Sequence, residues 1–138
     1  VNILDNKQYT KEDLLQIATK LEGHPDNVAP AIFGGAVAAY YDGTTVFHTP
    51  LHFPRSLSFV TFIPDYQLLT EKARAALPKD LPFKQAVAAS AISNTLVAAL
   101  AGNSIETARH LIEQDQFHEE ARAHLAPELT IIRRIAHQ

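Results

Sequence analysis

Cysteine, methionine and tryptophan are all absent from the 138 residues of this sequence. Without cysteine the chain can form no disulfide framework, thiolate nucleophile or thiolate metal site, which fits the reducing conditions of the cytoplasm. Positive charge is also scarce, because 12 lysines and arginines stand against 15 acidic residues and leave a net charge of −3. The basic residues form no run interleaved with aromatic residues, so we expect no nucleic-acid partner.

Long apolar runs are missing as well. The longest apolar stretch, from Ala86 to Ala101, is interrupted by polar residues and is too short to span a bilayer. A signal peptide is not expected, since Asp5, Asn6 and Lys7 interrupt any early apolar run. These features predict a cytoplasmic protein without a membrane partner.

The two ends of the chain do not resemble the ends of a complete domain. Position 1 is a valine, and residues 1–4 have the pattern of a helix end rather than a helix start. The last eight residues also stop within a helical pattern. A hydrophobic content of 46% is enough for a core, and the length fits one domain or pieces of two. We therefore expect a fragment of a longer protein.

The segment from Leu21 to Gly35 has the highest density of special residues in the chain. Pro25 suits the first position of a short helix over 25–33, with His24 as its cap and Gly34-Gly35 at its end. A capped helix at a turn would explain the prolines and glycines. It would not explain three adjacent polar side chains, so we favour a functional site at His24, Asp26 and Asn27.

The first part of the chain has patterns for one longer helix and a hairpin. Thr10 and Asp13 have the spacing of a capping box for a helix over 11–21. The apolar face of this helix would consist of Leu14, Leu15, Ala18 and Leu21. Two β-prone runs, 36–41 and 44–48, flank Asp42-Gly43, which favours a two-residue hairpin loop.

The second part of the chain is predicted to be mostly helical. Residues 49–55 contain two prolines and are the best candidate for a domain boundary. A buried strand is expected over 56–63, and the predicted helices cover 70–77, 83–101, 104–115 and 128–137, with a loop over 117–127. This mixture of helices with a few strands predicts an α+β layered fold.

The run Glu22-Gly23-His24-Pro25-Asp26-Asn27-Val28-Ala29-Pro30-Ala31, followed by two hydrophobic residues and Gly34-Gly35, resembles the signature of the homoserine kinase family. That family belongs to a superfamily of small-molecule kinases that includes galactokinase, mevalonate kinase and phosphomevalonate kinase. The resemblance implies that residues 1–48 are the end of an N-terminal kinase domain. Residues 49–55 would then be a linker, and residues 56–138 most of a ferredoxin-like C-terminal domain.

Two later motifs carry further parts of this resemblance. Thr70 at a helix cap and Arg74 one turn later could hold a carboxylate together. Their spacing alone favours a routine cap and a solvated arginine, whereas the family carries a substrate-binding Ser/Thr-x-x-x-Arg pattern here. The run from Asp115 to Arg122 resembles the family's Asp-x-Leu-His-x-Pro-Tyr-Arg, with Glu-Ala in place of Pro-Tyr. Arg122 then corresponds to a second carboxylate ligand, while His118 is either functional or simply packed under a loop.

By this resemblance, the parent protein transfers the γ-phosphoryl group of ATP to the hydroxyl of L-homoserine and makes O-phosphohomoserine for threonine biosynthesis. Asp26 and Asn27 would be catalytic and would line the homoserine pocket with His24. Thr70, Arg74 and Arg122 would hold the carboxylate. Whether Asp26 acts as a base is left open, as is a homodimer.

The cofactors implied are ATP and magnesium, although the family's phosphate-binding loop would precede Val1. The magnesium ligand is not matched, because Gln16 stands near its expected place. The seven histidines show no spacing typical of a resident metal site. We expect the isolated chain to be inactive. The alternative is a non-catalytic α+β module that binds an amino acid or a partner chain.

Overall fold

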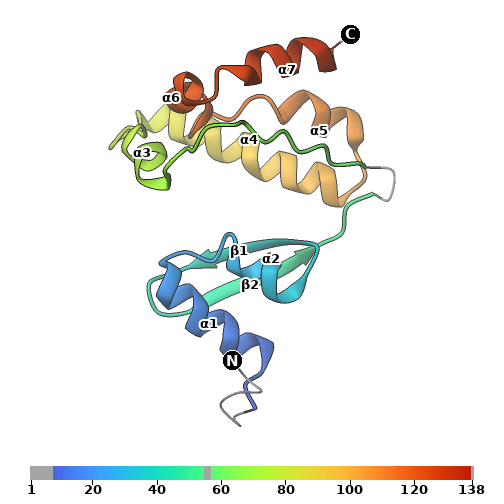
Figure 1. The fold of residues 1–138 in the computed structure, drawn as a ribbon. Coiled ribbons are helices and arrows are strands. Elements are labelled where there is room, and N and C mark those ends of the chain that lie inside the picture. Colours follow the sequence, from blue (N-terminus) through green and yellow to red (C-terminus); the bar gives the residue numbers. More distant parts are fainter. Residues whose placement is uncertain (1–7, 55–56, 138) are drawn as a thin grey trace. The chain divides into compact units, whose positions relative to one another are not determined.

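The structure, a computed structural model, describes residues 8–54 and 57–137. These residues form seven α-helices, one 3₁₀ helix and a pair of antiparallel strands, which confirms the α+β class (Figure 1). The chain separates into two compact units, Val1–Pro54 and Arg55–Gln138. The helix end expected over residues 1–4 lies outside the described residues.

Helix α1 (Lys11–Glu22) begins with the predicted capping box. The Thr10 hydroxyl accepts a hydrogen bond of 3.1 Å from the Asp13 N–H, and the Asp13 carboxylate accepts one of 2.9 Å from the Thr10 N–H. Gly23 ends the helix in the left-handed region, with φ of 87°. The predicted apolar face is right for Leu15, which is buried, but wrong for Leu21, which is 85% exposed because no described residue of this unit covers that end of the helix.

Strands β1 (Ala36–Tyr41) and β2 (Val46–Leu51) form the hairpin, with Tyr41 opposite Val46. The expected two-residue loop is wrong, because four residues connect the strands. Asp42 closes this longer loop, since its carboxylate accepts hydrogen bonds from the N–H groups of Thr44 and Thr45, each of 2.8 Å. The second strand also continues to Leu51, into the stretch expected to be a loop.

The core of the first unit lies between the hairpin and the helices α1 and α2 (Val28–Phe33). Val46 on β2 is buried with Leu15 of α1 and Ala29 of α2, so both helices cover the same face of the hairpin (Figure 1). Gln16 of α1 reinforces this packing through its side-chain amide. It accepts a hydrogen bond of 2.9 Å from the Val46 N–H and donates one of 3.2 Å to the Val46 carbonyl.

The described part of the second unit contains helices joined by loops, and its first residues, 57–69, have no regular secondary structure. Its elements are α3 (Thr70–Ala75), α4 (Phe83–Ala101), α5 (Ile105–Leu111), α6 (Glu119–Arg122), the 3₁₀ helix η1 (Ala123–Leu125) and α7 (Glu128–Ala136). Helices α4 and α5 lie side by side and bury small residues, among them Ala89, Ala99 and Ala108 (Figure 1). Helix α4 has the predicted ends, and Gly102 follows it as expected.

Three predictions for this unit are wrong. Residues 57–63 form no strand, and Val60 and Ile63 are 77% and 87% exposed. A strand needs a partner for its backbone groups, and the described residues of this unit offer none. Helix α5 ends at Leu111 instead of near 115, and Asp115 then folds the residues that follow it into a turn. The loop expected over 117–127 contains α6 and η1.

Within the described ranges, none of the helices is long and apolar enough to cross a membrane.

Candidate functional site

The six predicted site residues fall into two groups, one in each unit. The first group follows α1 in the first unit and the second is carried by α3 and α6 in the second unit. The groups consist of His24, Asp26 and Asn27, and of Thr70, Arg74 and Arg122.

His24 lies in the turn between α1 and α2, with a carboxylate on either side of its ring. Its Nε2 is 3.6 Å from a carboxylate oxygen of Glu22, and its Nδ1 is 3.6 Å from one of Asp26. These distances are too long for hydrogen bonds but short enough for mutual attraction when the ring is charged. The side chain is only 24% exposed, and the buried Nδ1 has no hydrogen-bond partner among the described residues. A buried ring nitrogen without a hydrogen-bond partner is rare in proteins.

Asp26 and Asn27 present their side chains to solvent just before α2. The Asp26 side chain is 74% exposed. Helix α2 begins at Val28, so the prediction that Pro25 starts the helix and that His24 caps it is wrong. Asn27 occupies the cap position instead, yet its side chain makes no capping hydrogen bond. The side chains of His24 and Asn27 therefore do not cap α2.

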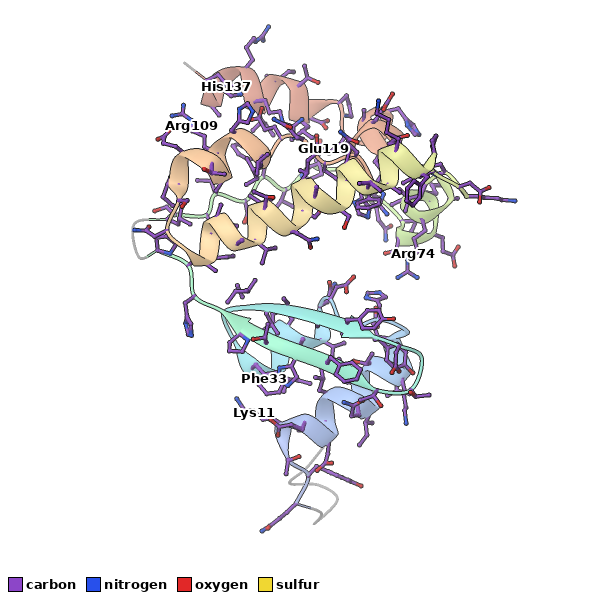
Figure 2. All side chains as sticks on the ribbon, turned by 180° about the vertical axis from the view of Figure 1, so that it is seen from behind. Lys11, Phe33, Arg74, Arg109, Glu119 and His137 are labelled. Carbon is purple, nitrogen blue, oxygen red and sulfur yellow. The ribbon has the colours of Figure 1, made fainter. Side chains whose placement is uncertain are left out.

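Phe33 is the last residue of α2, at the end opposite to this turn, and its ring contacts two side chains. Its ring stacks on His48 of β2, with ring centroids 4.3 Å apart. The Lys11 Nζ lies 5.7 Å from the centroid of the Phe33 ring, and Figure 2 labels both of these residues. The left-handed Gly34, with φ of 81°, then turns the chain into β1. These contacts fix the far end of α2, which is too short to be stable alone.

Thr70 and Arg74 are one turn apart on α3, and both are exposed. Thr70 is the first helical residue and Leu69 occupies the cap position, so the expected capping role of Thr70 is wrong. Residues four apart lie on the same side of a helix, which places the hydroxyl and the guanidinium together. Arg74 extends outward from its helix (Figure 2).

Arg122 is brought to α3 from the other end of the unit's sequence. Its Nε–H donates a hydrogen bond of 2.8 Å to the carbonyl of Ala73, the residue before Arg74. The bond uses the Nε–H alone, so the two Nη groups form the edge of the guanidinium that can bind a carboxylate. Two arginines from separate motifs therefore meet at one short helix.

The turn before α6 is organised by Asp115. Its carboxylate accepts hydrogen bonds from the N–H groups of Phe117, at 2.9 Å, and His118, at 3.1 Å, and lies 3.2 Å from the His118 Nδ1. The His118 carbonyl then accepts the Arg122 N–H at 3.0 Å and so begins α6. Burial acts to raise the pKa of Asp115, but these hydrogen bonds and the nearby His118 outweigh it and lower the pKa below its usual value. His118 therefore has a partner inside the turn.

Two further side chains have roles that the sequence motifs did not reveal. The Tyr66 hydroxyl donates to the Leu125 carbonyl at 3.2 Å and lies 2.9 Å from a carboxylate oxygen of Glu128. Arg133 of α7 forms an ion pair with Glu119 of α6. Tyr66 follows the Pro64-Asp65 pair that precedes α3, but its partners are about 60 residues away, and no local pattern identifies them.

The described residues include few groups that could bind a nucleotide or a metal ion. No cluster of three histidine or acidic side chains that could hold a metal occurs among them. Gln16, near the expected place of a magnesium ligand, binds both backbone groups of Val46. The printed sequence has five glycines and no glycine-rich phosphate loop. Among the described residues we therefore find no set of side chains that fits magnesium, and the sequence contains no loop that fits the phosphates of ATP.

Comparison with known proteins gives close relatives of one kind. The homoserine kinase of Leuconostoc mesenteroides is 61% identical over 137 residues, and that of Limosilactobacillus fermentum is 50% identical over 139 residues. Each alignment covers 99% of this chain but 47% and 48% of the relative, so the chain spans about half the length of these curated relatives.

A solved structure from Listeria monocytogenes, provisionally described as a homoserine kinase, matches with a TM-score of 0.74 and 35% identity. This match covers 98% of the chain and 43% of that protein. No protein-family model matches the chain.

Proposed function

We propose that this chain supplies the homoserine-binding part of a homoserine kinase. The chain belongs to the homoserine kinase family and spans about half the length of the curated members that it matches. The parent enzyme would transfer the γ-phosphoryl group of ATP to the hydroxyl of L-homoserine. Its product, O-phosphohomoserine, would serve threonine biosynthesis.

The observation that carries this proposal is the hydrogen bond from Arg122 to the Ala73 carbonyl. It places the second arginine beside the helix that carries Thr70 and Arg74, although the chain has Glu-Ala where the family motif has Pro-Tyr. A carboxylate is the natural ligand for two guanidinium groups and a hydroxyl, because charge-assisted hydrogen bonds to it are strong. We assign Thr70, Arg74 and Arg122 to the substrate carboxylate.

The turn before α2 is assigned to the reacting end of the substrate. Asp26 and Asn27 would be the catalytic residues, with His24 beside them in the homoserine pocket. Their side chains can accept and donate hydrogen bonds to a hydroxyl or an amino group. Phosphoryl transfer needs mainly positioning and charge neutralisation, so holding the hydroxyl in place is a sufficient role without a strong base.

Homoserine kinases use ATP, and we propose that the parent enzyme uses it with magnesium. Since the residues present do not fit either group, the isolated chain should not phosphorylate homoserine. An ATP-dependent assay on the purified chain tests this expectation, and turnover that disappears in Asp26→Ala would contradict it.

We further propose that the parent enzyme is cytoplasmic, and a homodimer is a prediction that light scattering on the full-length protein can test. The absence of cysteine fits the reducing conditions of the cytoplasm.

A substrate comparison tests the carboxylate assignment directly. The full-length protein should phosphorylate L-homoserine far better than aminopropanol, which is homoserine without its carboxylate. Arg74→Ala and Arg122→Ala should lose this preference while turning over aminopropanol as well as wild type does. Homoserine binding without ADP formation in the wild-type protein would instead favour the non-catalytic module.

A further inference from the structure

Helix α3 carries two of the proposed carboxylate ligands but has little stability of its own. It is six residues long, no residue in it is buried, and no side chain caps its N-terminus. An isolated helix of this length does not form in water. The position of Thr70 and Arg74 must therefore come from contacts between α3, the segment leading into it, and the rest of the unit.

Long-range hydrogen bonds anchor this region at two points. Arg122 holds the body of α3 through the Ala73 carbonyl. Tyr66 holds the segment four residues before the helix, because its hydroxyl donates to the Leu125 carbonyl at 3.2 Å and contacts the Glu128 carboxylate at 2.9 Å. Leu125 ends η1 and Glu128 begins α7, so this second anchor ties the approach to α3 to the C-terminal helices.

The protonation state of Tyr66 suits a lasting contact between its hydroxyl and the C-terminal helices. The hydrogen bond to Glu128 raises the pKa of Tyr66, with smaller contributions from burial and from the charges of Glu128 and Asp65. The phenol therefore stays protonated at neutral pH and remains a donor. The single phenol proton is shared between these two acceptors, and the contact with the charged Glu128 carboxylate is the shorter one.

We propose that Tyr66, held by Glu128 and the Leu125 carbonyl, is a positioning residue that sets the place of Thr70 and Arg74 for the substrate carboxylate. This inference rests on the proposed function, because it assumes that these two residues bind that carboxylate. Tyr66 touches neither the substrate nor ATP in this picture. Its loss should weaken homoserine alone.

The test uses the full-length enzyme and the variants Tyr66→Phe, Glu128→Ala and Glu128→Gln. Tyr66→Phe and Glu128→Ala should raise KM for homoserine about two- to tenfold, the effect of one ordinary hydrogen bond, with KM for ATP unchanged and kcat within about twofold. Glu128→Gln keeps an acceptor oxygen and should stay near wild type. The double variant Tyr66→Phe/Glu128→Ala should be no worse than Tyr66→Phe, because Tyr66→Phe already removes the contact with Glu128.

Tyr40→Phe is the matched control, since it removes an exposed phenol hydroxyl from β1 in the first unit and should change neither KM. The inference is overturned if Tyr66→Phe leaves KM for homoserine unchanged, or if both KM values rise together. Arg74→Ala in the same assay separates a failure of the positioning role of Tyr66 from a failure of the proposed carboxylate site. If Arg74→Ala raises KM for homoserine and Tyr66→Phe does not, only the positioning role fails. If Arg74→Ala has no effect either, the proposed carboxylate site fails and the inference fails with it.

Discussion

The Nε–H of Arg122 donates a 2.8 Å hydrogen bond to the carbonyl of Ala73, a residue 49 positions earlier in the chain. This bond joins α6 to α3 and places two arginines at one helix. The turn made by Asp115 and the ion pair between Arg133 and Glu119 hold α6 from its other sides. A carboxylate ligand would thus meet a guanidinium that is already oriented, which lowers the entropy lost on binding.

Removing either arginine should weaken homoserine binding and spare ATP. In the full-length protein, Arg74→Ala and Arg122→Ala should each cost roughly 1.5–3 kcal/mol, or about ten- to a hundredfold in affinity, because each removes a charge-assisted hydrogen bond. Calorimetric titration with homoserine and with ATP measures both effects. Arg109→Ala, which removes an exposed arginine of α5, is the matched control and should bind both ligands normally. An equal loss of ATP affinity would make these arginines phosphate ligands instead.

Asn27→Ala should impair catalysis far more than folding. The Asn27 side chain makes no capping hydrogen bond, so its loss should lower the melting temperature by no more than about 4 °C, the effect of a lost cap. A residue that positions the reacting hydroxyl can cost on the order of a hundredfold in rate. Thermal unfolding and steady-state kinetics on one preparation measure both quantities. The control Asn94→Ala removes an exposed amide that bonds only one turn back, to Ser90, and should change neither. Near-normal turnover in Asn27→Ala would show that this turn only connects α1 to α2 and has no role in catalysis.

Gln16→Ala should destabilise the first unit without changing the magnesium requirement. The substitution leaves the N–H and carbonyl of Val46 without their side-chain partners, at a cost of about 1–3 kcal/mol in the free energy of unfolding. The magnesium concentration for half-maximal activity of the full-length enzyme should stay the same, because the amide is occupied by the backbone. Urea unfolding and a magnesium titration of activity provide the two measurements. A large rise in the magnesium requirement would show that Gln16 is a ligand after all.

Asp115 should stabilise the protein in a pH-dependent way. Its pKa in the folded state lies below the ordinary value of 3.8, so the unfolded chain binds the proton more readily. The stabilisation is therefore complete above that ordinary value and is lost as the pH falls through the lower folded-state pKa. The difference in free energy of unfolding between wild type and Asp115→Asn should be full near about pH 5 and shrink below about pH 4. Urea unfolding curves at several acidic pH values test the sign, and a difference that grows on acidification would contradict it.

The features of the fold that were predicted correctly depend on neighbours in the sequence. The capping box joins Thr10 to Asp13, three positions later, and the turn at Gly34 depends on the freedom of glycine to adopt positive φ. Helix α4 is a long apolar run followed by Gly102, so both of its ends were visible in the sequence. The site residues could likewise be named from local motifs, although naming them did not reveal their surroundings.

The errors arise where a pattern lacks the partner that it needs, or where the local backbone takes another course than the pattern favours. Residues 57–63 have the composition of a strand, but composition cannot supply the partner that a strand needs. The hairpin loop has four residues because the Asp42 carboxylate satisfies the N–H groups of Thr44 and Thr45, a choice that the Asp-Gly pair alone does not indicate. Helix α2 begins three residues later than predicted, although Pro25 is well suited to a helix start.

The sequence by itself determined the capping box of α1, the turn at Gly34, the α+β class and the family resemblance, because each depends on residues a few positions apart. Only the tertiary structure decided that Arg122 meets Ala73, that Tyr66 meets Glu128, and that the Gln16 amide is bound by Val46. These contacts join residues 30 to 62 positions apart. Such contacts form only when the packing of helices and strands brings the two residues together. The local propensities of the sequence carry no information about which distant residues will meet.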